Sequence, residues 1–351
     1  MNSKKTIIAT FSLLLCALLV MGTINVVIDP LFQYHKPWFG LEANVIDERY
    51  QNAGVAKNFD FENVVIGNSM TENFLVSDVE KTFKGKTVKL SASGSHVLDW
   101  TYLLKILEQR AVHPQNILIN LDSGFFDSSD KTMKHEMPLY LYDNNYLNDV
   151  EYLFNFSLTR KYSYGTLKAN MNDNIPEYDT VFVWGYEKEI GKDVVLKEYE
   201  IAKKENTEAE NTFTDFYTEG NLLLLKDYFE SMPDTRFVFF CSPFSVLYWK
   251  EKYDLEQLVE YKAEFAKTFE FMSQYDNVAV YFWTDSQMLN IISDLDNYKD
   301  STHYGMHINK EMLKRIEQNV GELPKNKSEW QPLLDGYFDY LENFDYDKLF
   351  E

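Results

Sequence analysis

The sequence predicts an α/β protein: a three-layer domain on a doubly wound, parallel, five-stranded sheet, with an N-terminal transmembrane helix and a large insertion. Three observations lead to this fold class. From residue 61 onward, short β-branched or aromatic runs alternate with segments of helical periodicity, which is typical of a parallel sheet covered on both faces. An uncharged apolar run at residues 7–28 precedes the domain. A long segment at residues 124–217 separates the third predicted strand from the fourth.

Composition limits the classes of function. The 351 residues carry 55 acidic and 34 basic side chains, and this net charge of −21 argues against binding to the phosphate backbone of nucleic acid. Because Cys16 lies in the apolar N-terminal run, neither a disulfide with Cys241 nor a cysteine-ligated zinc site is expected. We therefore expect no nucleic-acid partner. Asp300, His303 and His307 are spaced as a metal site could be, but Gly305 weakens the histidine pair and no further ligand suggests itself, so we expect no metal and no cofactor.

The apolar run is predicted to anchor the chain in a lipid bilayer. Residues 7–28 are long enough to span a bilayer as a helix, and Lys4 and Lys5 are expected to stay in the cytoplasm. No convincing small-x-small cleavage site follows, so residues 1–30 are interpreted as an uncleaved signal anchor, with a cleaved signal peptide as the alternative. The protein is then a single-pass protein of the cell membrane, and the chain after residue 30 is extracytoplasmic. Residues 31–60 form a stalk or lead-in.

Five strands are expected in the domain at residues 61–324. They are residues 64–66, 87–92, 117–121, 237–240 and 278–282. Helical spacing of apolar residues marks the segments 76–83, 97–109, 221–230, 255–274 and 309–320. Right-handed crossovers between such strands produce a flavodoxin-like, doubly wound domain.

Two further segments complete the predicted organisation. The insertion at residues 124–217 is expected to cover the carboxyl edge of the sheet or to extend beside it, because both flanking strands end there. Within it, residues 147–156 and 195–204 look helical, and the acidic run 205–211 looks like an exposed loop. The acidic, aromatic tail at residues 325–351 is expected to pack back on the domain as a helix.

Ser69 stands directly after the first predicted strand and before a helix. This is where α/β proteins place their chemistry, since the backbone N–H groups of the helix end favour negative charge. Taken alone, Ser69 and Glu72 also match a capping box, in which the serine only satisfies a backbone donor. Polar residues follow other predicted strands as well, and all are expected at the same edge of the sheet.

The residues Asp300 and His303 predict a Ser-His-Asp triad with Ser69. At a separation of three, the carboxylate of Asp300 reaches Nδ1 of the imidazole, and the other nitrogen takes a proton from the serine. Ser69 is then the nucleophile, His303 the general acid–base and Asp300 the orienting group. The backbone N–H groups of Ser69 and Gly94 are expected to form an oxyanion hole. The alternative for Asp300 is a helix cap, and the alternative for His303 is a histidine in a surface loop.

Five other residues are candidates for lining the pocket. They are Asn68, His96, Asp122, Tyr248 and Trp249. The two aromatic residues follow the fourth strand and suit the wall of an acyl or glycan pocket. Aromatics at that spacing are, however, more often part of the core.

These motifs resemble those of the SGNH (GDSL-like) hydrolase family. That family has a nucleophilic serine after strand one, a glycine after strand two, an asparagine after strand three, and Asp-x-x-His near the C-terminus. The chain has Gly67-Asn68-Ser69 in place of the usual Gly-Asp-Ser, Gly94 in the second block, and Asp300 with His303 in the last. The resemblance covers about residues 61–124 and 235–320, without the insertion.

The third block departs from the family pattern. Where Gly-x-Asn-Asp is expected, the chain has Leu121-Asp122-Ser123-Gly124. The oxyanion hole then lacks one side-chain donor unless Ser123 supplies it, and such a donor is typically worth about 10²–10³ in turnover.

With its anchor, the chain is similar to membrane-anchored SGNH-like proteins of D-alanyl-lipoteichoic-acid transfer and polysaccharide O-acetylation. The resemblance implies an extracytoplasmic serine esterase or acyltransferase that acts on an acylated cell-envelope polysaccharide or glycopolymer. It also implies a membrane-bound O-acyltransferase as a partner. The alternative is a non-catalytic, anchored binding or assembly protein that keeps the scaffold.

Overall fold

A computed structural model of the chain describes residues 3–205 and 215–350. It divides into two compact units. The first unit holds the chain up to Asp60 together with Glu136–Val181, and the second holds Phe61–His135 and the chain from Phe182 onward. The insertion predicted at residues 124–217 is therefore shared between the two units.

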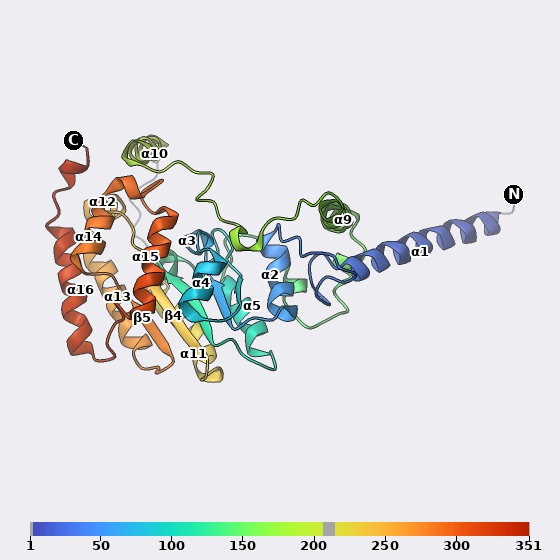
Figure 1. Cartoon of the computed structure of the whole chain (residues 1–351), viewed down its shortest axis with the longest axis horizontal. Helices are drawn as coiled ribbons and strands as arrows, with labels where there is room; N and C mark the ends of the chain where they lie inside the picture. Colours follow the sequence, from blue (N-terminus) through green and yellow to red (C-terminus); the bar gives the residue numbers. More distant parts are fainter. Residues whose placement is uncertain (1–2, 206–214, 351) are drawn as a thin grey trace. The chain divides into compact units, whose positions relative to one another are not determined.

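The second unit is built on one parallel sheet. Its strands are β1 (Asn63–Ile66), β2 (Thr87–Lys89), β3 (Asn116–Leu121), β4 (Arg236–Cys241) and β5 (Val278–Tyr281) (Figure 1). They lie in the order β2-β1-β3-β4-β5, and all neighbours are parallel. The five predicted strands are confirmed, and the order is that of flavodoxin-like sheets, whose ligands bind where the winding reverses beside β1. Ser69 follows this strand directly.

Helices flank the strands in two packed groups. Their bounds are α4 (Val76–Phe83), α5 (Val97–Glu108), α11 (Thr218–Ser231), α13 (Leu258–Met272), α15 (Met306–Glu317) and α16 (Lys327–Glu342). α4 packs against α15, whereas α5, α11, α13 and α16 pack in succession. In α16, Trp330 and Phe338 are buried against aromatic rings of α13, so the C-terminal tail is a helix packed on its domain, as expected.

The second unit has further helices outside these two groups. They are α3 (Ser69–Glu72), α6 (Ser123–Asp127), α10 (Lys192–Glu205), α12 (Val246–Asp254) and α14 (Ser286–Ser293), with the 3₁₀ turns η5 (Leu295–Asn297) and η6 (Tyr346–Leu349). α12 and α14 were not predicted from the sequence. α10 matches the predicted helix at 195–204, whereas the acidic run that follows lies, beyond Glu205, outside the described residues.

The first unit joins the N-terminal helix to the middle of the insertion. Its elements are α1 (Ser3–Ile28), α2 (Glu48–Asn58), α7 (Val150–Leu153), α8 (Phe156–Leu158), the π-helical turn η2 (Thr159–Ser163), α9 (Tyr164–Met171), and the 3₁₀ turns η1 (Leu139–Leu141) and η3 (Tyr178–Thr180). α1 is long and apolar enough to cross a membrane, a test that a signal sequence also passes. Residues 31–60 pack against the insertion: Lys57 Nζ donates to the carbonyl of Leu141 (2.7 Å), and Tyr142 donates to that of Arg49 (2.8 Å).

The single helix predicted at residues 147–156 is wrong. The structure has two short helices there, α7 and α8, and Asn155 lies between them. The side chain of Asn155 accepts hydrogen bonds from the N–H groups of Ser157 (3.0 Å) and Leu158 (3.1 Å), so it caps α8. An asparagine with non-helical backbone at a cap starts a new helix and interrupts the apolar periodicity that the sequence shows.

Candidate active site

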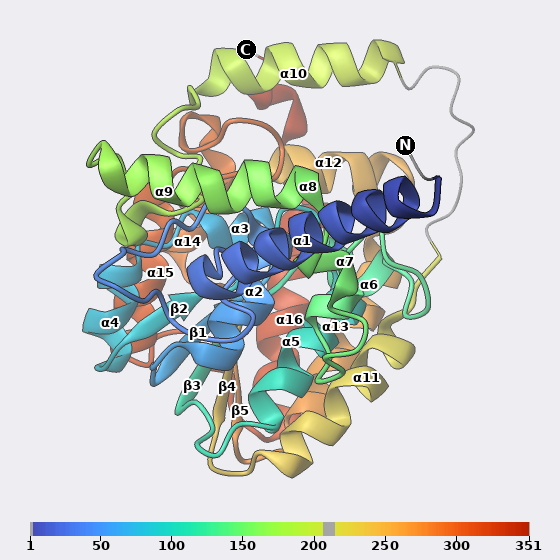
Figure 2. The ribbon, with the colours of Figure 1, turned by 90° about the vertical axis from the view of Figure 1, so that its right-hand side faces the viewer.

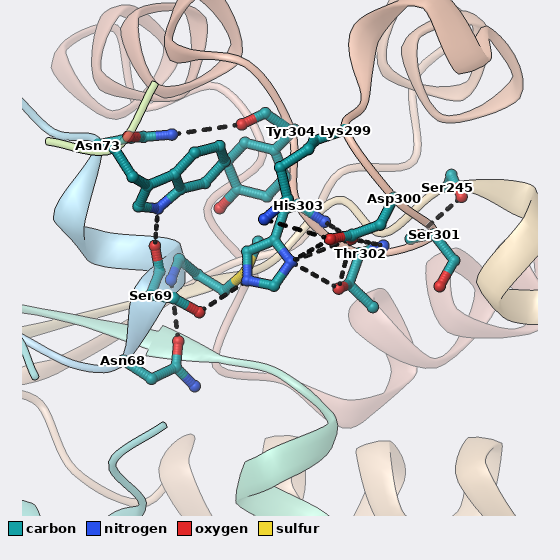
Figure 3. A network of polar contacts seen from close by, with 12 residues as sticks. Asn68, Ser69, Asn73, Ser245, Lys299, Asp300, Ser301, Thr302, His303 and Tyr304 are labelled. Atoms are coloured by element: carbon teal, nitrogen blue, oxygen red, sulfur yellow. Dashed lines mark hydrogen bonds and ion pairs between the residues drawn. The ribbon is translucent and has the colours of Figure 1, made fainter. Parts of the chain in front are cut away.

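The hydroxyl of Ser69 faces a histidine and does not cap its helix. The cap of α3 is Asn68, whose Oδ1 accepts a hydrogen bond from the N–H of Met70 (3.0 Å). Ser69 is the first residue of α3, and its Oγ lies 2.8 Å from Nε2 of His303 (Figure 3). The capping-box interpretation of Ser69 is therefore wrong, because its neighbour performs that task.

His303 is held by the carboxylate of Asp300 from the other side of its ring. Nδ1 of His303 lies 2.9 Å from Oδ2 and 3.0 Å from Oδ1 of Asp300 (Figure 3). Oδ1 also accepts hydrogen bonds from the backbone N–H groups of His303 (2.8 Å) and Thr302 (3.0 Å), so the turn itself fixes the carboxylate. The structure thus brings Ser69, His303 and Asp300 into one hydrogen-bonded chain, with distances within reach of proton transfer.

Electrostatics favour an ionised Asp300. Burial alone would raise the pKa of this carboxyl, but the hydrogen bonds from His303 and Thr302 outweigh it and hold the pKa below its ordinary range. Nζ of Lys299, 3.5 Å from Oδ2, adds a positive charge. An ionised carboxylate keeps the proton of a neutral imidazole on Nδ1, which leaves Nε2 free to accept the proton of the serine.

Asn120 of β3 supports the serine turn and was missed in the sequence. Its side chain is fully buried, and its Oδ1 accepts the backbone N–H of Asn68 (3.2 Å). A Cβ on Gly67 would lie 2.1 Å from that oxygen, so only glycine lets the amide approach so closely. Nδ2 of Asn120 donates to Oδ2 of Asp122 (2.7 Å). A polar residue inside an otherwise apolar strand is the sequence signal that could have indicated it.

Asn68 and Asp122 line the pocket beside Ser69, as expected, and their polar groups also bind one another. Nδ2 of Asn68 donates to Oδ2 of Asp122 at 2.8 Å, and both side chains are buried. Burial raises the pKa of Asp122, although the hydrogen bonds from Asn68 and other donors act in the opposite direction. Both candidates therefore have a structural role beneath the serine.

An open pocket of about 510 Å³ adjoins Ser69 and His303, a size typical of small-molecule sites. Its other walls include Gly94, His96, Ser123, Asp127, Lys134 and Phe244. Tyr248 and Trp249 do not line it: both are buried in α12, where they pack on the aromatic core beside Tyr261. The expectation that these two rings wall the pocket is therefore wrong, and Phe244 occupies that position.

Two backbone donors are available in this pocket. Among the described residues, no hydrogen bond uses the N–H of Ser69 or of Gly94. Gly94 has a positive φ of 66°, and a Cβ there would lie 2.7 Å from Nε2 of His135. Both the backbone conformation and the neighbouring ring thus require glycine. Ser123, the first residue of α6, lines the same pocket.

His96 is a neutral histidine in the wall of the pocket. Its Nδ1 lies 3.0 Å from Oγ of Ser128. Burial, and then the positive charges of Lys134 and His135, lower the pKa of His96 to about 4. At neutral pH it therefore offers hydrogen bonds without a charge, in contrast to Lys134.

Trp184 packs directly on the triad and comes from the insertion. Its Nε1 donates to the backbone carbonyl of Ser69 (3.0 Å), and its ring meets that of His303 edge-on, with centroids 5.4 Å apart. Nζ of Lys299 lies over the indole, 5.0 Å from the ring centre. The loop is held because Oδ1 of Asn73 accepts the N–H of the next residue, Gly185 (2.9 Å).

Replacing Trp184 is expected to slow the acyl transfer that the sequence predicts, without weakening substrate binding. Trp184→Phe keeps the ring beside His303 but loses one hydrogen bond, which predicts a fall in kcat of about 3- to 10-fold at unchanged KM. Trp184→Ala also removes the ring and is expected to cost about 10- to 100-fold. Trp38→Phe, in the first unit, is the matched control. Equal falls for the control and Trp184→Phe would contradict a positioning role.

Ligands for a metal ion do not gather at this site. Within residues 3–205 and 215–350, no group of three or more His, Cys, Asp or Glu side chains is arranged to hold one. His307, close in sequence to His303, instead has its Nε2 2.9 Å from Oδ1 of Asn297.

The fold and the site together define an α/β protein with a Ser-His-Asp arrangement at the carboxyl edge of a parallel sheet. Compared with known proteins, the sequence matches no protein-family model and no curated protein. The chemistry open to the site therefore follows from its own geometry.

Proposed function

We propose that the chain is an SGNH-type serine esterase or acyltransferase, anchored in the membrane and extracytoplasmic, that acts on an acylated cell-envelope polysaccharide or glycopolymer. The observation that carries the proposal is the chain of hydrogen bonds from Ser69 through His303 to Asp300, beside an open pocket. A capping serine and a surface histidine have no reason to meet in this way.

The reaction proceeds in two acyl transfers. Oγ of Ser69 attacks the acyl carbonyl while Nε2 of His303 takes its proton, and the N–H groups of Ser69 and Gly94 stabilise the oxyanion. The tetrahedral intermediate breaks its bond to the alcohol oxygen, which leaves with the proton from His303, and the acyl group stays on Ser69. A water molecule or a sugar hydroxyl then attacks this ester, with His303 as base, and restores the free serine.

The lining of the pocket supports a hydroxyl-rich substrate. Beside the triad it presents Lys134, Asp127 and the neutral His96, whereas Phe244 supplies an apolar wall. Such groups offer donors and acceptors to sugar hydroxyls around one small acyl group. A membrane-bound O-acyltransferase that delivers acyl groups is the partner this proposal implies, with α1 holding the two proteins in one membrane.

The proposal predicts covalent labelling of Ser69. The parent protein in membranes is expected to react with a fluorophosphonate probe, and mass spectrometry should place the adduct on Ser69. Ser69→Ala should abolish the adduct yet lower the free energy of unfolding by less than about 1 kcal/mol, because Asn68 is the helix cap. Ser273→Ala, at the end of α13, is the matched control. A folded parent protein that never labels would favour the non-catalytic scaffold.

A further inference from the structure

In the last turns of α1, Gly22 and Asn25 are buried in the first unit, where this helix packs against α7 and η2. Asn25 is fully buried; its Nδ2 donates to Oγ1 of Thr159 (2.8 Å), and its Oδ1 accepts from Oγ of Ser163 (2.7 Å). Gly22 lies against the ring of Phe154, which a Cβ would approach to 3.0 Å. These contacts fix the C-terminal end of α1 to residues 154–163.

The dimensions of a bilayer place this end of α1, near Asn25, at the membrane surface. A hydrocarbon core of about 30 Å takes about 20 helical residues at a rise of about 1.5 Å each. Counted from Lys5, the last charge before the apolar run, such a span ends near Asn25. The earlier turns of α1 expose apolar side chains, such as Phe11 (68%) and Leu13 (73%), as a helix in lipid does. Phe154 and Thr159 then lie at the level of the outer headgroups.

Residues 156–171, which are α8, η2 and α9 and are hereafter called the surface helix, expose an aromatic and basic face. Phe156 is 71% exposed, Tyr164 62% and Met171 84%. Arg160 and Lys168 alternate with Phe156 and Tyr164 at a spacing of four, which places these four residues on the same side of a helix. No acidic residue occurs in residues 152–172, although the whole chain has a net charge of −21. This composition is typical of segments at a membrane interface.

The direction of the surface helix also suits a membrane plane. In Figure 1, α1 runs along the picture while α9 is seen end-on, and in Figure 2 α9 runs across the view. The two helices therefore cross, and both belong to the first unit. A helix that crosses a membrane-spanning helix at its outer end lies along the lipid surface.

We infer that the surface helix lies on the outer leaflet and binds the headgroups of anionic lipids. Phe156 and Tyr164 enter the interface, while Arg160 and Lys168 contact lipid phosphates. Lys161 contributes little, because its Nζ is paired with Asp47 at 2.8 Å. The inference rests on the membrane-spanning α1 of the proposed function, but not on the chemistry of Ser69.

A fluorescent reporter at position 164 tests this contact in the full chain. Cys241 is buried and stays, so Cys16→Ser with Tyr164→Cys leaves one reactive thiol for an environment-sensitive dye. The protein is reconstituted into phosphatidylcholine vesicles with or without phosphatidylglycerol, some carrying headgroup-level nitroxide lipids. The dye is expected to be quenched by the nitroxide and blue-shifted, and more strongly with phosphatidylglycerol.

Charge reversal separates lipid binding from general electrostatics. Arg160→Glu with Lys168→Glu should remove the phosphatidylglycerol-dependent part of the quenching. Lys84→Glu with Lys310→Glu makes the same change in net charge at exposed sites of the second unit and should preserve it. Equal loss in both double variants would overturn the inference, since binding would then follow net charge alone.

The native Cys16 distinguishes the two ways in which the inference can fail. Dye on Cys16, exposed on α1, should be quenched by nitroxides placed deep in the acyl chains. If the dye is quenched at Cys16 but not at position 164, the surface contact is overturned and the anchored enzyme of the proposed function still stands. The exposed face of the surface helix would then be assigned to a protein partner. Absence of quenching at Cys16 overturns both the anchor and the contact. Labelling of Ser69 is read independently in each case.

Discussion

Replacing His303 by glutamine is expected to lower the rates of probe labelling and of ester cleavage by about 10⁴-fold or more. Glutamine can still accept a hydrogen bond from Ser69, but it cannot carry a proton from the serine to the leaving alcohol. The loss should therefore fall on kcat, and single-turnover kinetics on an acylated glycan would measure it. His113→Gln, at the end of the sheet where β3 begins, is the matched control and should retain the parent rates.

Neither Asp300 nor His96 should make the rate of acyl transfer depend on pH between about pH 6 and 8. Hydrogen bonds from His303 and Thr302 hold the pKa of Asp300 below its ordinary range, so this carboxylate stays ionised. Burial and nearby positive charge lower the pKa of His96 to about 4, so this imidazole stays neutral. Asp300→Asn should lower activity less completely than His303→Gln; an unchanged rate would contradict the orienting role.

Asn120→Ala is expected to cause the largest loss of stability among the residues around the site, about 2–4 kcal/mol in the free energy of unfolding. The change removes the acceptor for the N–H of Asn68 and one of the donors to the buried Asp122. Both groups then stay buried with fewer hydrogen bonds, a state that costs more than the bond itself contributes. Thermal unfolding in detergent would show the loss as a lower Tm.

Asn116→Ala provides the comparison within the same strand. Nδ2 of Asn116 donates to Oδ1 of Asn63 (2.8 Å), but Asn116 is only half-buried and water replaces the lost bond. Its substitution should cost clearly less and leave labelling of Ser69 unchanged. Asn120→Ala, in contrast, should also slow labelling, because the serine turn loses its support. Equal losses of stability in the two variants would show that Asn120 has no special part in holding this turn.

The sequence alone determined the sheet and the three residues of the triad. Apolar strands buried on both faces are short-range patterns, so β1 to β5 were found within a few residues. Parallel strands bring their carboxyl ends to one edge, which is why Ser69, Asp300 and His303 were expected together although 231 positions separate the first two. Helix limits were less certain: Asn155 divides a predicted helix because a local side-chain cap outweighs periodicity.

Only the tertiary structure decided which side chains support the triad. Asn68, not Ser69, caps α3, because the hydroxyl of Ser69 finds His303 from a distant turn. Trp184 reaches the site from an insertion whose course no local pattern specifies. Tyr248 turns into the core although its position after β4 suited the pocket. Spacing determines which edge of a sheet a residue occupies, whereas the direction of its side chain depends on contacts with segments remote in sequence.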